Sequence, residues 1–336
     1  MNESGQKAET AIWNEGWIQV KVPLPFSLKW VNSYVIPEPD ASGFTIIDPG
    51  LRTEDAIAAW NEVFSRHQLE ASRIKRIILT HQHPDHYGLA GYFQQLSGAP
   101  VYLSRRSHAY AVRLWGEHSH YADELLSQFE EHGMPEELRS SIAGNLALFK
   151  GRVSPQPQIT YIEAGETIAF GGYDWKLINA PGHAYGQLLY YEESNGWLFC
   201  GDQVLPRITP NISVVPGEEE DPLGDFLANL DELLQYEVKL AFPGHRDPFD
   251  SFSNRIEELK GHHIRRLEKM KGLLEQPMSA FTVCEALFGA SLRSNPHNLR
   301  FAMSETLAHL FYLERRGDAS RKRDEARVWL YSSISC

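Results

Sequence analysis

The chain has 336 residues, of which 42% are hydrophobic and 23% charged, and a formal net charge of −12. These values are typical of a soluble globular protein with one large domain and room for a small second one, and the negative charge disfavours a surface made for nucleic acid. The three cysteines give no disulfide framework, the N-terminus lacks an apolar signal core, and no apolar run is long enough to span a membrane. We therefore expect a cytoplasmic protein without a membrane partner.

The N-terminal part alternates between strand and helix patterns. Short β-branched or aromatic runs bounded by Pro, Gly and Asp predict strands at 17–22, 32–36, 44–50, 73–81 and 99–104. Apolar residues at helical spacing predict helices at 54–67 and 86–98. From about 105 to 150 the pattern is helical and polar, which indicates a helical insertion.

Strand patterns return after the insertion and end before a compositional change near Asn254. Strands are predicted at 159–170, 173–183, 187–194, 196–202 and 238–245, with a helix at 221–235. Further helices are predicted at 254–276, 281–289 and 298–317, followed by a charged hairpin at 318–333. We therefore predict a domain at 1–253 and a smaller one at 254–336.

The segment "THQHPDH" concentrates metal-binding side chains where a predicted strand ends. His81, His83, Asp85 and His86 fall within six positions. Neutral imidazole and carboxylate are ligands that zinc accepts, and a catalytic zinc keeps one position open. Four neighbouring groups cannot all reach one ion and complete its shell, so further ligands must come from elsewhere.

Three more metal-binding side chains follow predicted strands. His183 lies in "APGHAYG", Asp202 in "FCGDQ" and His245 in "FPGH", each directly after a glycine. Glycine permits the close backbone approach that such a site needs. Five histidines and two aspartates together predict a metal centre.

This combination, with Asp48 in "IIDPG", resembles the metallo-β-lactamase superfamily over roughly residues 13–248. The resemblance implies an α/β fold, an αββα sandwich with the site at one edge. It assigns His81, His83 and His183 to a first metal, Asp85, His86 and His245 to a second, and Asp202 to both. It also implies that Asp48 orients the ligand turn.

The chemistry implied by the resemblance is hydrolysis at two divalent metal ions. A hydroxide bridging the ions would attack an ester, thioester or lactone of a small molecule, with Asp85 and Asp202 as catalytic groups. The ligand types favour zinc, and iron and manganese remain alternatives. "LPRITPN" follows Asp202 closely, so Arg207 and Asn211 are candidate substrate contacts, although Arg207 equally suits pairing with an acidic neighbour. The helical insertion would narrow the cleft, which favours a small substrate.

The C-terminal pattern resembles the winged-helix domain of the lactamase-like protein 2 subgroup. Residues 298–317 would take the recognition-helix position, with Arg300, Ser304 and His309 as outer-face candidates, and His262 and His263 are expected to be solvated. Basic residues of the tail would meet phosphates, or, as we prefer, pair with Asp324 and Glu325; they are Arg321, Lys322, Arg323 and Arg327. The alternative function is therefore a metal-dependent endoribonuclease with RNA as partner, and a homodimer through these helices is also open.

Overall fold

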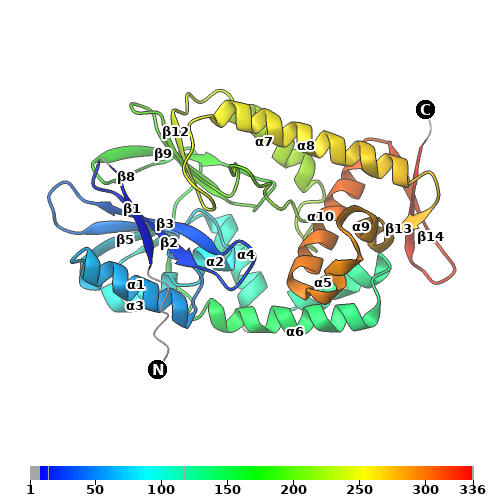
Figure 1. Cartoon of the computed structure of the whole chain (residues 1–336), viewed down its shortest axis with the longest axis horizontal. Coiled ribbons are helices and arrows are strands. Elements are labelled where there is room, and N and C mark those ends of the chain that lie inside the picture. The colour runs from blue at the N-terminus through cyan, green and yellow to red at the C-terminus, as the bar shows by residue number, and fades with distance from the viewer. Residues whose placement is uncertain (1–7, 14, 117–118, 335–336) are drawn as a thin grey trace.

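The computed structural model describes residues 8–13, 15–116 and 119–334, and two β-sheets form its N-terminal part (Figure 1). The first sheet has seven strands in sequence order, antiparallel from β1 to β4 and parallel from β4 to β7. Its strands are β1 (Glu9–Ile12), β2 (Ile18–Pro23), β3 (Trp30–Pro37), β4 (Phe44–Ile47), β5 (Ile74–Ile78), β6 (Val101–Leu103) and β7 (Ile159–Tyr161). The second sheet has the order β12-β11-β10-β9-β8. Its strands are β8 (Thr167–Phe170), β9 (Tyr173–Asn179), β10 (Leu188–Glu192), β11 (Trp197–Gly201) and β12 (Leu240–Pro243).

Aromatic side chains fill the space between the two sheets. Trp17 directly precedes β2, and Tyr34 belongs to β3. Both pack against aromatic residues of the second sheet, namely Trp175, Phe199 and Phe242. Alternate residues of a strand point to the same face, so each strand contributes every second side chain to this layer. Burying one phenylalanine such as Phe199 contributes about 1.5–3 kcal/mol, so this layer fixes the two sheets relative to each other.

Helices cover the outer faces of both sheets. α1 (Glu54–Arg66) and α3 (Ala90–Ser97) pack on the first sheet, and α7 (Pro222–Leu233) and α8 (Phe252–Leu273) cover the second (Figure 1). The Thr53 side chain accepts a hydrogen bond from the Ala56 backbone N–H, which caps α1. The predicted αββα sandwich is confirmed.

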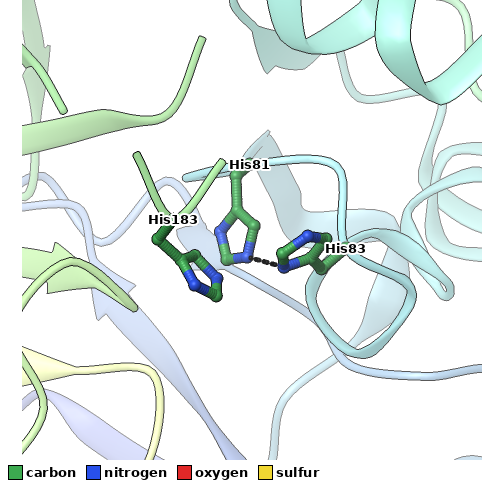
Figure 2. A group of neighbouring side chains, drawn as sticks. All are labelled: His81, His83 and His183. Carbon is green, nitrogen blue, oxygen red and sulfur yellow. Dashed lines mark hydrogen bonds between the residues drawn. The ribbon is translucent and has the colours of Figure 1, made fainter. Parts of the chain in front are cut away.

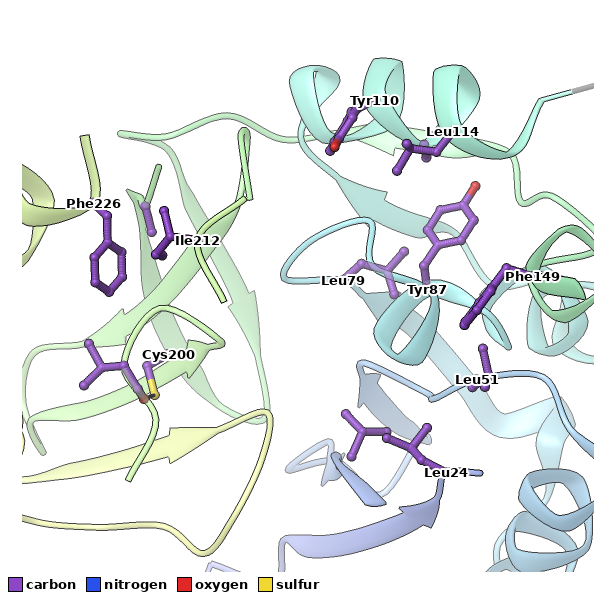
Figure 3. Packing of buried hydrophobic residues seen from close by; sticks show 14 of the residues in the cluster. Leu24, Leu51, Leu79, Tyr87, Tyr110, Leu114, Phe149, Cys200, Ile212 and Phe226 are labelled. Atoms are coloured by element: carbon purple, nitrogen blue, oxygen red, sulfur yellow. Dashed lines mark hydrogen bonds between the residues drawn. The ribbon is translucent and has the colours of Figure 1, made fainter. Parts of the chain in front are cut away.

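The insertion consists of three helices that reach from the first part of the chain to α10 (Pro296–Arg315) and the C-terminal hairpin. They are α4 (Arg105–Trp115), α5 (Tyr121–Glu131) and α6 (Glu136–Arg152). Tyr110 and Leu114 of α4 and Phe149 of α6 face Tyr87 and belong to the same buried cluster (Figure 3). The insertion is therefore part of the core and is held by apolar packing.

The C-terminal part combines helices with a small sheet. After α8 come β13 (Met278–Ser279), α9 (Ala280–Phe288), the short helix η2 (Ala290–Ser294), α10 (Pro296–Arg315), β14 (Ala319–Arg323) and β15 (Trp329–Ser333). The three strands pair antiparallel in the order β13-β15-β14, which confirms the hairpin predicted at the tail. The domain boundary predicted at Asn254 falls within the first turn of α8 and stays a prediction. None of the helices in the described ranges is both long and apolar enough to cross a membrane.

The middle of α10 lies in the interior of the molecule, so two of the three outer-face candidates are buried, and the third, Arg300, is half-buried and lines a cavity. The helix contacts α6, α7, α8, α9 and β14. Ser304 is 4% exposed and His309 is fully buried. His263 of α8, which was expected to be solvated, is also fully buried. The polar residues of α10 misled the sequence interpretation because they are paired inside the protein.

His263 and His309 hydrogen-bond to each other across α8 and α10. His309 Nδ1 donates to the backbone oxygen of Glu305 at 2.8 Å, since a carbonyl can only accept. His309 Nε2 therefore accepts, at 3.1 Å, from Nδ1 of His263. Burial lowers the pKa of both imidazoles, to about 2 for His263 and about 3 for His309.

The basic hairpin pairs with acidic side chains other than the expected ones. Arg321 pairs with Glu314 at 3.2 Å and Arg323 with Glu131 at 2.7 Å. Asp324 instead accepts a hydrogen bond from the Val328 backbone within the turn. The expected pairing within the turn is thus replaced by pairing with α10 and α5.

Candidate metal centre

The ligand turn follows β5 and leads into a one-turn helix, α2 (Pro84–Tyr87). Pro84 occupies the first helical position, where its missing N–H has no partner to lose. The His86 backbone N–H donates to the His83 carbonyl at 3.0 Å, which closes the turn. The compact turn places His81, His83, Asp85 and His86 side by side.

The distant ligands arrive from strand ends of the second sheet. His183 follows β9, Asp202 follows β11 and His245 follows β12. The approach is so close that a Cβ atom on Gly244 would lie 2.3 Å from Asp202 Oδ1 and 2.5 Å from His86 Cε1. Only glycine fits at this position without displacing a ligand.

All seven sequence-predicted ligands meet in one place, where they form three overlapping groups. Within each group the candidate ligand atoms lie within 4.8 Å of one another; the groups are His81 with His83 and His183, His81 with His86 and Asp202, and Asp85 with His86 and His245. Figure 2 shows the three imidazoles of the first group turned toward a common point. Asp202 Oδ2 lies 3.7 Å from His183 Nε2 and 3.3 Å from His245 Nε2, so this carboxylate stands between the two histidine clusters.

Asp48 orients the ligand turn as expected for a supporting carboxylate. Its oxygens accept hydrogen bonds from the Thr80 backbone N–H at 2.8 Å, the Thr80 hydroxyl at 2.7 Å and His86 Nδ1 at 2.8 Å. Because the hydroxyl proton goes to Asp48, the Thr80 oxygen accepts from His81 Nδ1 at 2.9 Å. With Nδ1 engaged in this way, Nε2 is the ring nitrogen of His81 and of His86 that is turned toward the centre; in the absence of metal, His81 Nε2 lies 2.9 Å from His83 Nδ1.

Backbone carbonyls orient both distant histidines in the same way. Nδ1 of His183 donates to the Asn211 carbonyl and Nδ1 of His245 to the Trp30 carbonyl, both at 2.9 Å. Each bond turns Nε2 toward the centre. Sequence reasoning missed Trp30 and the Asn211 carbonyl because every residue carries a carbonyl, so the sequence holds no signal for them.

The unpaired atoms of the site fit bound divalent metal. Nε2 of His86, His183 and His245 and Oδ1 of Asp202 are buried and have no hydrogen-bond partner. Buried polar atoms are rarely left unpaired, and these four face one another. Nitrogen and carboxylate ligands converging in this way suit a borderline cation such as zinc.

The metal-free electrostatics divide the site into two parts. Burial and the imidazoles around them lower the pKa of His81 well below its usual range and that of His83 to about 3. Burial also acts to lower the pKa of His245, but the carboxylates of Asp202 and Asp85 outweigh it and raise the value to about 10. Carboxylate charge is therefore concentrated on the side of His245, where a cation would be stabilised.

Of the two residues predicted to contact substrate, Asn211 lies at the cavity beside the site and Arg207 does not. The Asn211 side chain lines the cavity beside the site, but its amide donates to Glu305 Oε2 at 2.9 Å. Glu305 belongs to α10 and pairs with Arg266 of α8, so the C-terminal part holds the loop that orients His183. Arg207 is exposed and is not among the residues that line this cavity.

A cavity of about 260 Å³ adjoins the ligand cluster. Five of the seven ligands lie on its wall, namely His83, Asp85, His183, Asp202 and His245. The insertion contributes Tyr110, Leu114, Trp115, Tyr121 and Phe149. α10 contributes His297, Asn298, Arg300, Phe301 and Ser304. The C-terminal part thus closes the site, which the sequence interpretation did not anticipate.

Comparisons with known proteins agree with this architecture. The family model described as "Metallo-beta-lactamase superfamily" matches residues 31–245, and "Metallo-beta-lactamase-like, C-terminal domain" matches residues 267–334. A probable metallo-hydrolase, YqjP of Bacillus subtilis, is 29% identical over 313 residues, which are 89% of this chain and 92% of that protein. An atrochrysone carboxyl ACP thioesterase of a Cryptosporiopsis species is 23% identical over 76% of this chain and 62% of its own length.

A solved structure shares both the fold and the domain arrangement. The metallo-beta-lactamase family protein TTHA1429 of Thermus thermophilus superposes with a TM-score of 0.84 at 34% identity. The match covers 95% of this chain and 99% of the other, so it includes the C-terminal part. The chain belongs to the metallo-beta-lactamase superfamily and is a hydrolase of that superfamily.

Proposed function

We propose that this hydrolase cleaves an ester or thioester bond of a small molecule, using two divalent metal ions, zinc in the first place. The observation that carries the proposal is the cavity of about 260 Å³ that is lined in part by aromatic side chains and on which five metal-ligand candidates lie. Two such ions, when bound, supply an activated water and stabilise negative charge on the attacked carbonyl. Iron and manganese are the alternatives that the ligand set also accepts.

The residues around the cavity would have three roles, which are metal binding, hydrogen bonding to the reactants and exclusion of water. His81, His83 and His183 would hold one ion, Asp85, His86 and His245 the other, and Asp202 both. Asp85 faces the cavity and its Oδ2 lies 3.2 Å from His245 Nε2, so its ionised carboxylate would accept a hydrogen bond from the attacking water. The aromatic side chains of the insertion would exclude bulk water and strengthen these charge interactions.

Two further observations support a small acyl substrate. The thioesterase among the relatives acts, by its name, on an acyl carrier protein thioester. The RNA alternative depended on an exposed recognition helix, whereas Ser304 and His309 of α10 are buried and two hairpin arginines are paired. A cavity of this size also accommodates a small acyl group better than a folded nucleic acid.

Activity assays on the zinc-loaded protein test the proposal. Wild type is expected to hydrolyse short acyl thioesters or esters and to leave single-stranded RNA intact. His81→Ala, His183→Ala and Asp202→Ala are expected to abolish hydrolysis while circular dichroism shows a folded protein. Metal-independent hydrolysis, or RNA cleavage without any esterase or thioesterase activity, would refute it.

A further inference from the structure

An arginine without an acidic partner lies on the wall of the cavity. Arg300, on the first turns of α10, lines the same space as the metal-ligand candidates. Its Nε is buried without a hydrogen-bond partner. Within the described ranges no carboxylate lies within ion-pair distance of its guanidinium, and Phe301 and Tyr121 are its neighbours.

The surroundings of the guanidinium are neutral and aromatic. Its central carbon lies 4.1 Å from the ring centroid of Phe301. Burial raises the pKa of Tyr121, and the charge of Arg300 and a hydrogen bond with it oppose that shift, so the phenol is also close by. Stacking and one phenol compensate only part of the cost of taking a charged group out of water. The side chain is half-buried, and no carboxylate of the described residues engages the remaining donors of the fork, so a ligand in the cavity can accept hydrogen bonds from them.

Three other arginines of the C-terminal part each form an ion pair with a carboxylate. Arg266 pairs with Glu305, Arg293 with Glu285 and Arg321 with Glu314. Arg300 is more enclosed than Arg293 and yet has no such partner. The only carboxylates among the described residues that line the cavity are Asp85 and Asp202, and both face His245.

Arg300 is also the only lysine or arginine among the described residues that line the cavity. His297, one turn earlier on α10, stacks on Phe26 with ring centroids 4.4 Å apart and an interplanar angle of 8°. Burial and the charge of Arg300 lower the pKa of His297 to about 4, so this imidazole is neutral at pH 7. The cavity thus offers one positive charge from a basic side chain of the described residues, which lies on α10 beside the aromatic rings of Phe301 and His297.

We infer that Arg300 binds a carboxylate of the substrate, so that the hydrolysed ester or thioester carries a negative charge at the end remote from the scissile bond. This inference rests on the proposed function and adds to it the chemical class of the substrate. A guanidinium presents two parallel donors that match a carboxylate, and in a desolvated cavity such a pair is strong. The apolar part of the acyl group would pack on the aromatic wall formed by Phe26, His297 and Phe149.

A matched pair of substrates tests the inference on the zinc-loaded full-length protein. The probes are N-acetylcysteamine thioesters of succinic, glutaric, adipic and suberic acid, each compared with the same compound whose free carboxylate is a primary amide. Wild type is expected to prefer the carboxylate at its best chain length by at least about tenfold in kcat/KM. Arg300→Gln is expected to remove this preference and leave the amide substrates within about threefold, and Arg300→Lys to restore part of it. Arg316→Gln, an exposed arginine at the end of the same helix, is the control and is expected to behave as wild type.

A binding measurement separates failure of this inference from failure of the proposed function. Calorimetry with adipate and hexanoate on zinc-loaded protein is expected to show tighter binding of adipate to wild type and equal binding of the two to Arg300→Gln. If the amides are hydrolysed as fast as the carboxylates at every length, the inference is wrong and the proposed function stands. If no thioester or ester is hydrolysed, the proposed function is wrong, and equal binding of adipate and hexanoate to wild type then overturns the role of Arg300 as well.

Discussion

Replacing Asp48 by asparagine would test how far the ligand turn depends on one buried carboxylate. Asp48 has φ of +49°, a backbone region that asparagine and aspartate tolerate better than other non-glycine residues. The substitution therefore keeps shape and backbone and changes two properties, the charge and one acceptor. It replaces no candidate metal ligand, and it acts on the site through the hydrogen bond from His86 Nδ1.

The expected magnitude follows from the three hydrogen bonds that Asp48 accepts. In the less damaging orientation the new amide nitrogen faces the Thr80 backbone N–H, so one buried donor loses its acceptor at a cost of about 1–3 kcal/mol. The bond from His86 Nδ1 becomes a neutral one and loses about 1 kcal/mol more. The free energy of unfolding of the metal-free protein is expected to fall by about 2–4 kcal/mol. Because His86 is less firmly oriented and less basic, metal affinity is expected to fall about 10–100-fold.

The assay is a competition titration of zinc against a chromogenic chelator, together with urea unfolding of the metal-free protein. Asp174→Asn, on the exposed side of β9, serves as the control for loss of one acidic charge. A folded Asp48→Asn protein with zinc affinity within about threefold of wild type would show that Asp48 is a turn-forming residue and does not support the metal site.

Three other outcomes are expected. Gly244→Ala would drive a methyl group into Asp202 and is expected to lower the metal content found by elemental analysis. Gly272→Ala, with open space around it, is expected to keep the metal content of wild type. Equal metal content of the two variants would contradict the packing argument. Removing the metal with a chelator is expected to lower the unfolding midpoint, because an ion at a thousandfold excess over its Kd stabilises the native state by about 4 kcal/mol, and added zinc is expected to restore it. Acid is expected to destabilise the buried pair His263 and His309, whose pKa values in the folded state lie below the unfolded value near 6.5. Their contribution is complete above pH 6.5 and is lost as the pH falls, by about 1.4 kcal/mol per pH unit for each histidine, so His263→Asn is expected to flatten the slope of unfolding free energy between pH 6 and 4; an unchanged slope would refute this.

The sequence by itself determined the local features of this protein. Strand and helix ranges followed from apolar periodicity and from Gly, Pro and Asp at the element ends, as in α1 and β5. The ligands in the turn after β5 were readable because six consecutive positions of one turn cannot lie far apart. The distant candidate ligands His183, Asp202 and His245 were predicted because each follows a strand pattern and a glycine, and the superfamily resemblance assigned them to the same site as the turn.

Only the tertiary structure decided what depends on contacts between distant segments. The carbonyls of Trp30 and Asn211 orient two ligands, and no residue type marks such a role. The polar side chains of α10 suggested an exposed face, but Glu305 and His309 find partners on other elements and are buried. A polar side chain is predicted to be exposed unless its hydrogen-bond or ion-pair partner is known. That partner can be distant in the sequence, so only the tertiary structure identifies it. For the same reason the closure of the cavity by α10, and with it the position of Arg300, was settled by the fold.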